Sequence, residues 1–250
     1  MDIKTCIPPK LPLNRLNWET LVEPLGEAHR VLGQFDEILR QAKDPRRILA
    51  PLLGQEARAC LHSQKERLRE QIADYQSMLG ESIATSRTKP LSLALLRQMH
   101  KGLKKGGQFR KKQNWIGPEG CGIEEAYFYP PSPKRVARAM RELHHYLRTA
   151  ERDPLVQLAI YVAQLLIIHP FMDGNGRVAR AMVPLILFKK GLIAQPFFFL
   201  SAFFKRRRLE YFRKLFQISA HGEWEEWIRF FLAGITEQGR RNCKEARKWV

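Results

Sequence analysis

A segment in the second half of the chain carries side chains that could handle a phosphorylated substrate. It runs from His169 to Arg180 and reads HPFMDGNGRVAR. Its two glycines would let backbone N–H groups turn inward as an anion-binding nest, and the helix expected after them would add its N-terminus. Arg177 and Arg180 stand three residues apart, so both could project from one face of that helix. Two guanidiniums and a nest suit a di- or triphosphate better than a single carboxylate.

Two further side chains in this segment could take part in the chemistry. Asp173 offers a carboxylate oxygen beside the phosphates, which suits Mg²⁺ held by one carboxylate and the substrate. His169 is the one side chain here that can take up a proton near neutral pH. Each feature alone has a structural explanation, since Gly-Asn-Gly is a common turn and a histidine after a helix is often a cap. Their combination in one segment favours a phosphate-handling site.

The elements that must position this segment are predicted to be helices. Apolar residues recur every three or four positions over most of the chain. We expect helices over 16–80, 91–105, 134–149, 154–168, 202–218 and 223–238, and one after the glycines at 174–176. The stretch 154–168 is apolar nearly all round, which predicts a central buried helix. The polar stretch 80–90 is the best internal boundary.

One region cannot be a long helix. Residues 106–133 are rich in glycine and proline with interleaved aromatic residues, which is typical of a loop or a short hairpin turning at 118–120. The predicted fold class is therefore all-α with one small β excursion.

Composition limits the partners. Of the 250 residues, 44% are hydrophobic, which excludes a disordered chain despite a formal net charge of +18. Residues 101–250 hold 28 basic and 13 acidic side chains, so we expect a negatively charged partner: nucleotide phosphates, a nucleic acid or an acidic protein surface. No apolar stretch is long enough to span a membrane. The N-terminus carries prolines and charges where a signal peptide would be apolar, and the four cysteines form no CxxC pair, so we expect a cytoplasmic protein.

The 169–180 segment resembles the signature of the Fic family, HxFx(D/E)GNGRxxR, and matches it at every defined position. Further similarities span most of residues 16–235: QNWIGPEG and YPPSP resemble the flap hairpin, LSLALLRQMHKGL the helix that opens the core, and GEWEEWIRFF a helix near its end. The stretch from LNWETL to PLLGQEARA is similar to the helical region that precedes the core. The resemblance implies the Fic fold, a helical bundle around a central helix–loop–helix active site with a small β-hairpin flap. It divides the chain into an N-terminal helical region (1–88), a Fic catalytic core (89–238) and a basic tail (239–250).

The resemblance implies a protein adenylyltransferase that transfers AMP from Mg-ATP to a Tyr, Thr or Ser hydroxyl of a target protein. His169 would deprotonate the hydroxyl, and Asp173 would hold Mg²⁺. The phosphates would be bound by Gly174, Asn175, Gly176, Arg177 and Arg180. The flap residues Trp115, Ile116 and Gly117 would align the target by strand-like pairing. Because position 174 is Gly rather than Lys, AMP transfer is favoured over Doc-type phosphate transfer.

The sequence departs from the family pattern at the inhibitory helix, (S/T)xxxE(G/N). Alignment places Cys60 at the Ser position, Gln64 at the Glu position and Lys65 at the Gly position. A neutral amide cannot form a charge-assisted pair with Arg180. We therefore expect that the usual inhibition is absent. A competing near-match runs from Ser77 to Ser82.

The adenine end also departs from the pattern. Tyr211 and Phe212 stand where the family tends to have a Tyr-Tyr pair, and either ring could stack on a base. A donor other than ATP therefore stays open. The run Lys205–Arg208 could be a nucleic-acid patch, although a solvated helix face is the favoured interpretation.

Two other functions stay open, although Gln64 disfavours the second of them, which in the family depends on the inhibitory Glu. The first is a catalytically quiet Fic-fold protein whose basic surface binds nucleic acid or an acidic partner. The second is removal of AMP from a modified protein. A homodimer and delivery into another cell also stay open.

Overall fold

The computed structural model describes residues 8–61, 65–117, 122–126 and 128–249, and for residues 65–67, 123 and 249 it describes the backbone alone. Nearly all regular structure in this part of the chain is helical. The α-helices are α1 (Val22–Gln41), α2 (Arg46–Cys60), α3 (Lys65–Thr88), α4 (Leu93–Gly102), α5 (Pro133–Tyr146), α6 (Pro154–Ile168), α7 (Asn175–Lys189), α8 (Ser201–Arg206), α9 (Arg208–His221) and α10 (Trp224–Ala246). Short 3-10 turns cover Glu19–Leu21, Ile123–Glu125 and Arg247–Trp249. The predicted all-α class is confirmed.

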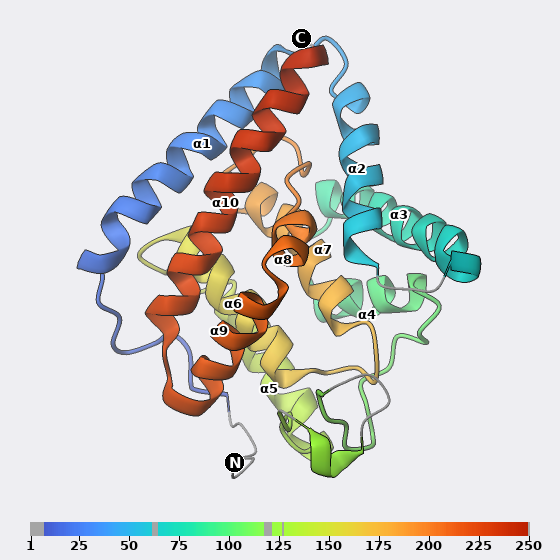
Figure 1. The fold of residues 1–250 in the computed structure, drawn as a ribbon, viewed down its shortest axis with the longest axis vertical. Coiled ribbons are helices and arrows are strands. Elements are labelled where there is room, and N and C mark those ends of the chain that lie inside the picture. The colour runs from blue at the N-terminus through green and yellow to red at the C-terminus, as the bar shows by residue number, and fades with distance from the viewer. Residues whose placement is uncertain (1–7, 62–64, 118–121, 127, 250) are drawn as a thin grey trace.

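The central helix is α6, as the sequence predicts. Every residue from Leu155 to Ile168 is buried. Asp153 caps its N-terminus by accepting a hydrogen bond from the Leu155 amide at 2.7 Å, and Pro154 occupies the first turn. The helix packs against α5, α7, α9 and α10, so it forms the axis on which the rest of the molecule is assembled (Figure 1).

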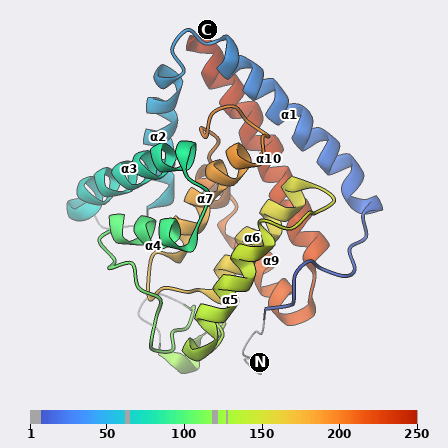
Figure 2. The same cartoon turned by 180° about the vertical axis from the view of Figure 1, so that it is seen from behind.

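The other helices surround α6 in two groups. On one side α1 and α10 lie side by side and run toward the same end of the molecule, so that the C-terminus lies beside the end of α1 (Figures 1 and 2). On the other side α2, α3 and α4 pack on one another, with α2 against α8 and with α3 and α4 against α7. This second group brings the N-terminal helices to the helix that follows the 169–174 loop.

The structure differs from the predicted helix boundaries in three places. Helix α3 continues through most of the polar stretch 80–90 and ends at Thr88. The helix expected over 202–218 is broken at Arg207 into α8 and α9. Residues 239–246, expected as part of a basic tail, continue α10 against α1. A Cβ atom at Gly239 would lie 2.4 Å from Val31, so the absent side chain lets the two helices approach closely.

The expected flap hairpin is reduced, among the described residues, to one antiparallel bridge. The Ile116 amide donates to the Phe128 carbonyl at 3.0 Å, and the Phe128 amide donates back at 3.2 Å. Residues 118–121 and 127, on which the expected turn falls, lie outside the described residues. The pairing nevertheless fixes which residues of the two arms face each other.

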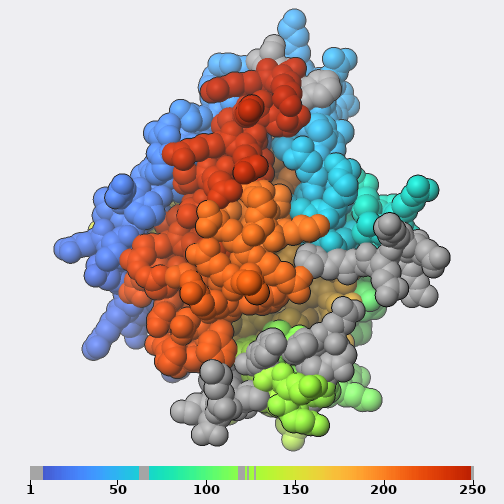
Figure 3. All heavy atoms as spheres, in the orientation of Figure 1, coloured from blue at the N-terminus to red at the C-terminus, as the bar shows by residue number. Residues whose placement is uncertain are grey.

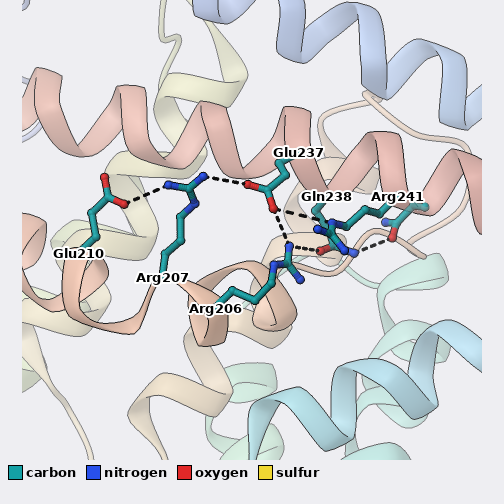
Figure 4. A network of polar contacts seen from close by, with 7 residues as sticks. Arg206, Arg207, Glu210, Glu237, Gln238 and Arg241 are labelled. Carbon is teal, nitrogen blue, oxygen red and sulfur yellow. Dashed lines mark hydrogen bonds and ion pairs between the residues drawn. The ribbon is translucent and has the colours of Figure 1, made fainter.

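The basic run at 205–208 is largely used within the fold. The Arg206 guanidinium lies 3.0 Å from a carboxylate oxygen of Glu237 on α10, and Arg207 reaches the other oxygen at 3.3 Å (Figure 4). Arg207 also pairs with Glu210 at 3.4 Å. These contacts join the break between α8 and α9 to α10, so the run acts as a helix-packing element. No helix of the described chain is long and apolar enough to cross a membrane.

Candidate active site

The loop between α6 and α7 is closed by the side chain of Asn175. Its Oδ1 accepts from the Phe171 amide at 2.8 Å, and its Nδ2 donates to the Phe171 carbonyl at the same distance. The Asn114 amide also donates to that carbonyl, at 3.1 Å. Asn175 is buried. Its side chain is therefore committed to shaping the loop, and the group that it can offer an anion is its backbone N–H.

The N-terminus of α7 presents backbone amides that could form a nest for an anion. Gly174 has φ +79°, a left-handed conformation that an L side chain would strain, and it turns the chain into α7. The amides of Asn175, Gly176 and Arg177 have no acceptor within the helix, as at any helix start. A Cβ atom at Gly176 would lie 2.9 Å from Nη1 of Arg180, so glycine lets that guanidinium lie over the first turn. The first turn thus presents amides and a cation in the same place.

His169 ends α6 in a left-handed conformation with φ +48°. Its ring Nδ1 lies 3.1 Å from the Leu166 carbonyl, which can only accept, so Nδ1 carries the proton and Nε2 is left as the basic nitrogen. Burial of the ring and the nearby Arg110 guanidinium lower the pKa of His169 to about 4. The imidazole is therefore neutral at physiological pH, as a proton acceptor must be.

Arg110 holds the end of α6 and both arms of the flap. This buried guanidinium donates to the His169 carbonyl at 2.9 Å, to the Lys112 carbonyl at 3.3 Å and to the Pro131 carbonyl. A cation at the C-terminus of a helix also complements its dipole. Arg110 therefore has a structural role in the site, because it ties the end of α6 to the flap.

Asp173 is held by three donors. Its Oδ1 accepts from the Gly174 amide at 2.6 Å, while Oδ2 lies 3.1 Å from the Arg177 guanidinium and 2.9 Å from the Lys105 ammonium. Burial raises the pKa of Asp173, but the two cations outweigh that effect and hold the pKa below its usual range. The carboxylate is therefore ionised and oriented. One exposed carboxylate beside a phosphate nest fits the way Mg²⁺ is bound, with few protein ligands and with substrate phosphates. The described residues hold no cluster of three or more metal-binding side chains.

His100 positions the same loop from α4. Its Nδ1 accepts from the Gly107 amide at 3.0 Å, so Nε2 carries the proton and donates to the Asp173 carbonyl at 2.9 Å. The ring stacks on Phe171 with centroids 3.8 Å apart. Burial lowers the pKa of His100, which favours this neutral form. Sequence reasoning missed the contacts of His100 and Lys105 with this loop, because neither residue belongs to the 169–180 motif.

Arg180 points away from Arg177, toward the end of α2. Its Nη2 donates to the Cys60 carbonyl at 3.3 Å and lies 3.2 Å from the Cys60 sulfur, and within the described residues its buried Nε has no partner. The spacing of the two motif arginines suggested that both point to one place, but in the structure their guanidiniums point in different directions. Cys60, aligned with the inhibitory helix, does lie at the second motif arginine. Gln64 lies outside the described residues.

Behind Arg180, Glu56 is a buried carboxylate that sequence reasoning did not single out. It accepts from the Ser201 amide at 3.1 Å, from the Ser201 hydroxyl at 2.5 Å and from the Tyr75 hydroxyl at 3.0 Å. Burial raises the pKa of Glu56, although these hydrogen bonds oppose the shift. The interaction joins α2, α3 and α8. The near-match at 77–82 is different, because Glu81 is exposed and pairs with Ser77 within α3.

A cavity of about 800 Å³ opens beside His169. Its lining comes from the end of α6, the start of α7, the flap and α9. Figure 3 shows the surface of α8 and α9 (orange) above the light-green surface that follows residue 121. The cavity is lined by Trp115, Ile116, Gly117, Phe128, Leu166, Ile167, His169, Gly176, Arg180, Arg208, Leu209, Tyr211, Phe212, Leu215, Phe216 and Ser219. The cavity therefore brings together the flap, His169, the start of α7 and the residues expected at the adenine end.

The two residues expected at the adenine end behave differently. Tyr211 is buried, packs against Phe204 and Trp227, and has a pKa raised to about 12 by burial. Phe212 is exposed at the cavity wall, with the Arg208 guanidinium 5.4 Å from its ring. Phe212 is thus the ring available for stacking, and Leu209 and Phe216 are apolar neighbours that the sequence did not indicate.

Comparison with known proteins identifies the domain. A sequence model described as the Fic/DOC family matches residues 90–187. The Protein adenylyltransferase Fic of Drosophila grimshawi is 28% identical over 138 residues, which cover 53% of this chain and 25% of that protein. The chain thus spans about a quarter of the length of the curated relatives that it matches.

Solved structures share the fold. A Fic family protein from Desulfovibrio desulfuricans G20 superposes with a TM-score of 0.74 at 20% identity, covering 92% of this chain and 75% of that one. IbpAFic2, covalently tethered to Cdc42 in its structure, gives a TM-score of 0.54 at 20% identity, covering 86% and 70% of the two chains. Residues 90–187 therefore form a domain of the Fic/DOC family, the chain has the all-α fold of the solved Fic structures, and the expected resemblance is confirmed.

Proposed function

We propose that this Fic-domain protein is a protein adenylyltransferase, which transfers AMP from ATP to a Tyr, Thr or Ser hydroxyl of a target protein. The observation that carries the proposal is the geometry at the junction of α6 and α7. There a neutral imidazole whose Nδ1 carries the proton, the first turn of α7 at Gly176 and the Arg180 guanidinium border one cavity. The adenylyltransferase named among the relatives supports the same reaction class.

His169 is proposed as the general base. Its Nε2 takes the proton of the target hydroxyl as the hydroxyl oxygen forms a bond to the α-phosphorus of ATP and the bond to pyrophosphate breaks. The Leu166 carbonyl holds the ring in the required tautomer, and Arg110 fixes the backbone of His169 itself. The negative charge of the bound phosphates would raise the pKa of His169 above the value that the ring has in the buried site without nucleotide.

The nest and the arginines are proposed to hold the phosphates. Backbone amides of Gly176 and Arg177 would face phosphate oxygens, and the Arg180 guanidinium would exchange its contacts with Cys60 for the terminal phosphate. Asp173 would hold Mg²⁺, which when bound neutralises phosphate charge. Positioning and charge neutralisation then supply most of the rate enhancement.

The nucleoside is proposed to lie in the apolar part of the cavity, with its base against Phe212. Leu209 and Phe216 continue that surface along α9. These contacts accept any base face, so the preference for adenine rests on smaller polar contacts.

The target segment is proposed to pair with the flap near Ile116, whose bridge to Phe128 already fixes the backbone of the two arms. The exposed Lys111 and Lys112 at the start of the flap favour an acidic target surface. A relative in this fold is tethered to Cdc42, which supports a protein target in general. A nucleic-acid partner is less favoured, because Arg206 and Arg207 pair with Glu237.

We also propose a division of roles along the chain. Residues 89–238 would form the catalytic core, and residues 1–88 a helical region that touches it through Cys60 at Arg180. Gln64 stands for the inhibitory Glu, so the protein would act without that restraint and Gln64→Glu would lower its activity. If Gln64→Glu leaves labelling unchanged, the hypothesis that Gln64 releases the usual inhibition is wrong. The free thiols of Cys60 and Cys243 are compatible with a cytoplasmic site of action.

The test is transfer of label from α-labelled ATP with Mg²⁺ to the protein itself and to a cell lysate. The unmodified chain is compared with His169→Ala, and Arg138→Met, an exposed change far from the motif, serves as the control. We expect label with the unmodified chain and the control, and none with His169→Ala. Equal labelling by all three proteins would refute His169 as the base, and no label with any nucleotide would refute the activity.

A further inference from the structure

A lysine outside the motif reaches its carboxylate. The Nζ atom of Lys105 lies 2.9 Å from Oδ2 of Asp173, the same oxygen that the Arg177 guanidinium contacts at 3.1 Å. Oδ1 of Asp173 is already bound by the Gly174 amide. One negative charge is thus faced by two cations beside a nest of amides. The net charge of this cluster is therefore positive, which favours binding of an anion.

The lysine is brought there by a constrained turn. After α4 the chain passes through left-handed conformations at Lys104 (φ +58°), Gly106 (φ +84°) and Gly107 (φ +75°). Gly107 cannot carry a side chain, since a Cβ atom would lie 2.8 Å from the Arg97 carbonyl. Its amide donates to His100 Nδ1 at 3.0 Å, and His100 in turn donates to the Asp173 carbonyl. His100 therefore joins the motif loop on one side and the end of the turn on the other, with Lys105 between these two contacts in sequence.

The head of Lys105 is nevertheless able to move. Its side chain is 40% exposed and that of Asp173 is 61% exposed. A lysine ammonium sits on a flexible stem, so it can change partner without a change in the backbone. The phosphates of a bound nucleotide carry more negative charge than one carboxylate, so they would compete with Asp173 for the ammonium.

We propose that Lys105 is a phosphate-binding residue of this site. Its ammonium pairs with Asp173 until the nucleotide enters, and then pairs instead with the β- and γ-phosphates. These two phosphates are the part of ATP that leaves as pyrophosphate. This inference rests on the proposed function, because it assumes that a nucleoside triphosphate occupies the nest. It adds to the motif a cation from the α4–flap segment, so the phosphates are held from two directions.

The test uses inorganic pyrophosphate, which needs neither a base pocket nor a transfer reaction. Binding is measured by calorimetry in the presence of EDTA for the unmodified chain, Lys105→Met, Asp173→Asn and the double variant. Lys104→Met is the matched control, because the neighbouring lysine has the same charge but lies 3.9 Å from Asp74 on α3. Lys105→Arg keeps the charge and should restore most of the affinity.

We expect Lys105→Met to weaken pyrophosphate binding by about ten-fold, the usual loss for a charge-assisted hydrogen bond. The same loss should appear in the Asp173→Asn background, where no carboxylate needs neutralising. Lys104→Met should change the affinity by less than about two-fold, as screened surface charges do.

Three results would overturn the proposal. If the loss disappears in the Asp173→Asn background, Lys105 only neutralises that carboxylate. If Lys104→Met weakens binding as much as Lys105→Met, the effect is one of overall charge. Failure of the unmodified chain to bind pyrophosphate would refute both this inference and the phosphate nest. Normal pyrophosphate binding without any label transfer from ATP would instead refute the adenylyltransferase function alone.

Discussion

On the phosphate side of the cavity the side chains are fixed by hydrogen bonds, whereas on the α9 side they are apolar and open to solvent. Asn175, Arg110 and His100 each bond to two or more backbone groups, and all three are buried. Across the cavity Leu209 is 86% exposed and Phe212 is 45% exposed. Apolar side chains left open beside a cavity are typical of a surface that a ligand or partner covers.

Under the proposed function, this difference separates the two tasks of the site. Transfer of a phosphoryl-linked group needs donors held in place before the substrate arrives, because reorganisation during the reaction is costly. Recognition of a base and of a target can use apolar contacts that form on binding. Substitutions on the phosphate side should therefore affect both folding and chemistry, while substitutions on the α9 side should affect substrate binding alone.

The largest effect is expected from Arg110→Met, because this guanidinium joins the end of α6 to both arms of the flap. Several carbonyl groups would lose their donor in a buried setting, and we expect a loss of about 3 kcal/mol in the free energy of unfolding. Chemical denaturation measures it. The control Arg138→Met removes an exposed arginine paired with Glu142 and should cost less than about 0.5 kcal/mol. Equal losses for the two variants would mean that Arg110 does not support the site.

The next effect tests the loop itself. Asn175→Ala removes both contacts to the Phe171 backbone, so we expect a loss of about 2 kcal/mol in stability and loss of pyrophosphate binding. Calorimetry and denaturation on the same sample separate the two. Retained pyrophosphate affinity in this variant would show that the nest forms without Asn175, and the phosphate side would then be less preorganised than the hydrogen bonds indicate.

A smaller effect is expected on the open side. Phe212→Ala should leave the free energy of unfolding within about 0.5 kcal/mol, because the ring is half exposed. The KM for ATP should rise by about ten-fold through lost stacking, with pyrophosphate affinity unchanged. Val22→Ala, an exposed apolar residue on α1, is the control. A stability loss like that of Asn175→Ala would remove the distinction between the two sides.

The smallest effect concerns a pair far from the cavity. His29 on α1 lies 2.8 Å from Asp153, the cap of α6, and this hydrogen bond raises the pKa of His29. The pair stabilises the fold below the usual histidine pKa of about 6.5, and this contribution is lost as the pH rises through the higher folded value. His29→Ala should therefore cost about 0.5 kcal/mol at pH 5.5 and little at pH 8.5, after allowance for exposure. A cost for His29→Ala that is the same at both pH values would contradict the pairing.

Much of the fold and the centre of the site could be predicted from the sequence. The apolar run of α6 predicts its burial, and the HPFMDGNGRVAR segment predicts a nest at the start of α7, because both depend on local patterns. The direction of a side chain is a different matter. The sequence predicted Asn175 as a phosphate ligand, yet its side-chain amide is hydrogen-bonded to the backbone of Phe171. The sequence also predicted that Arg180 would point to the same place as Arg177, yet its guanidinium lies at Cys60.

The residues that sequence reasoning missed depend on contacts between distant segments. Lys105 and His100 lie about seventy positions before Asp173, and their approach requires the left-handed turn at 104–107. The two glycines of that turn were the available signal. The break at Arg207 could not be read from periodicity either, because the Glu237 contact that accompanies it lies on α10.

The account can be tested most directly by following both ends of the nucleotide in one reaction. ATP labelled separately at the α- and γ-phosphates is incubated with the protein, Mg²⁺ and a cell lysate, and protein is separated from small molecules. We predict that the α label is retained on protein and that the γ label is released as pyrophosphate, with both events lost in His169→Ala. Retention of the γ label on protein, or retention of the α label when His169 is absent, would contradict the account.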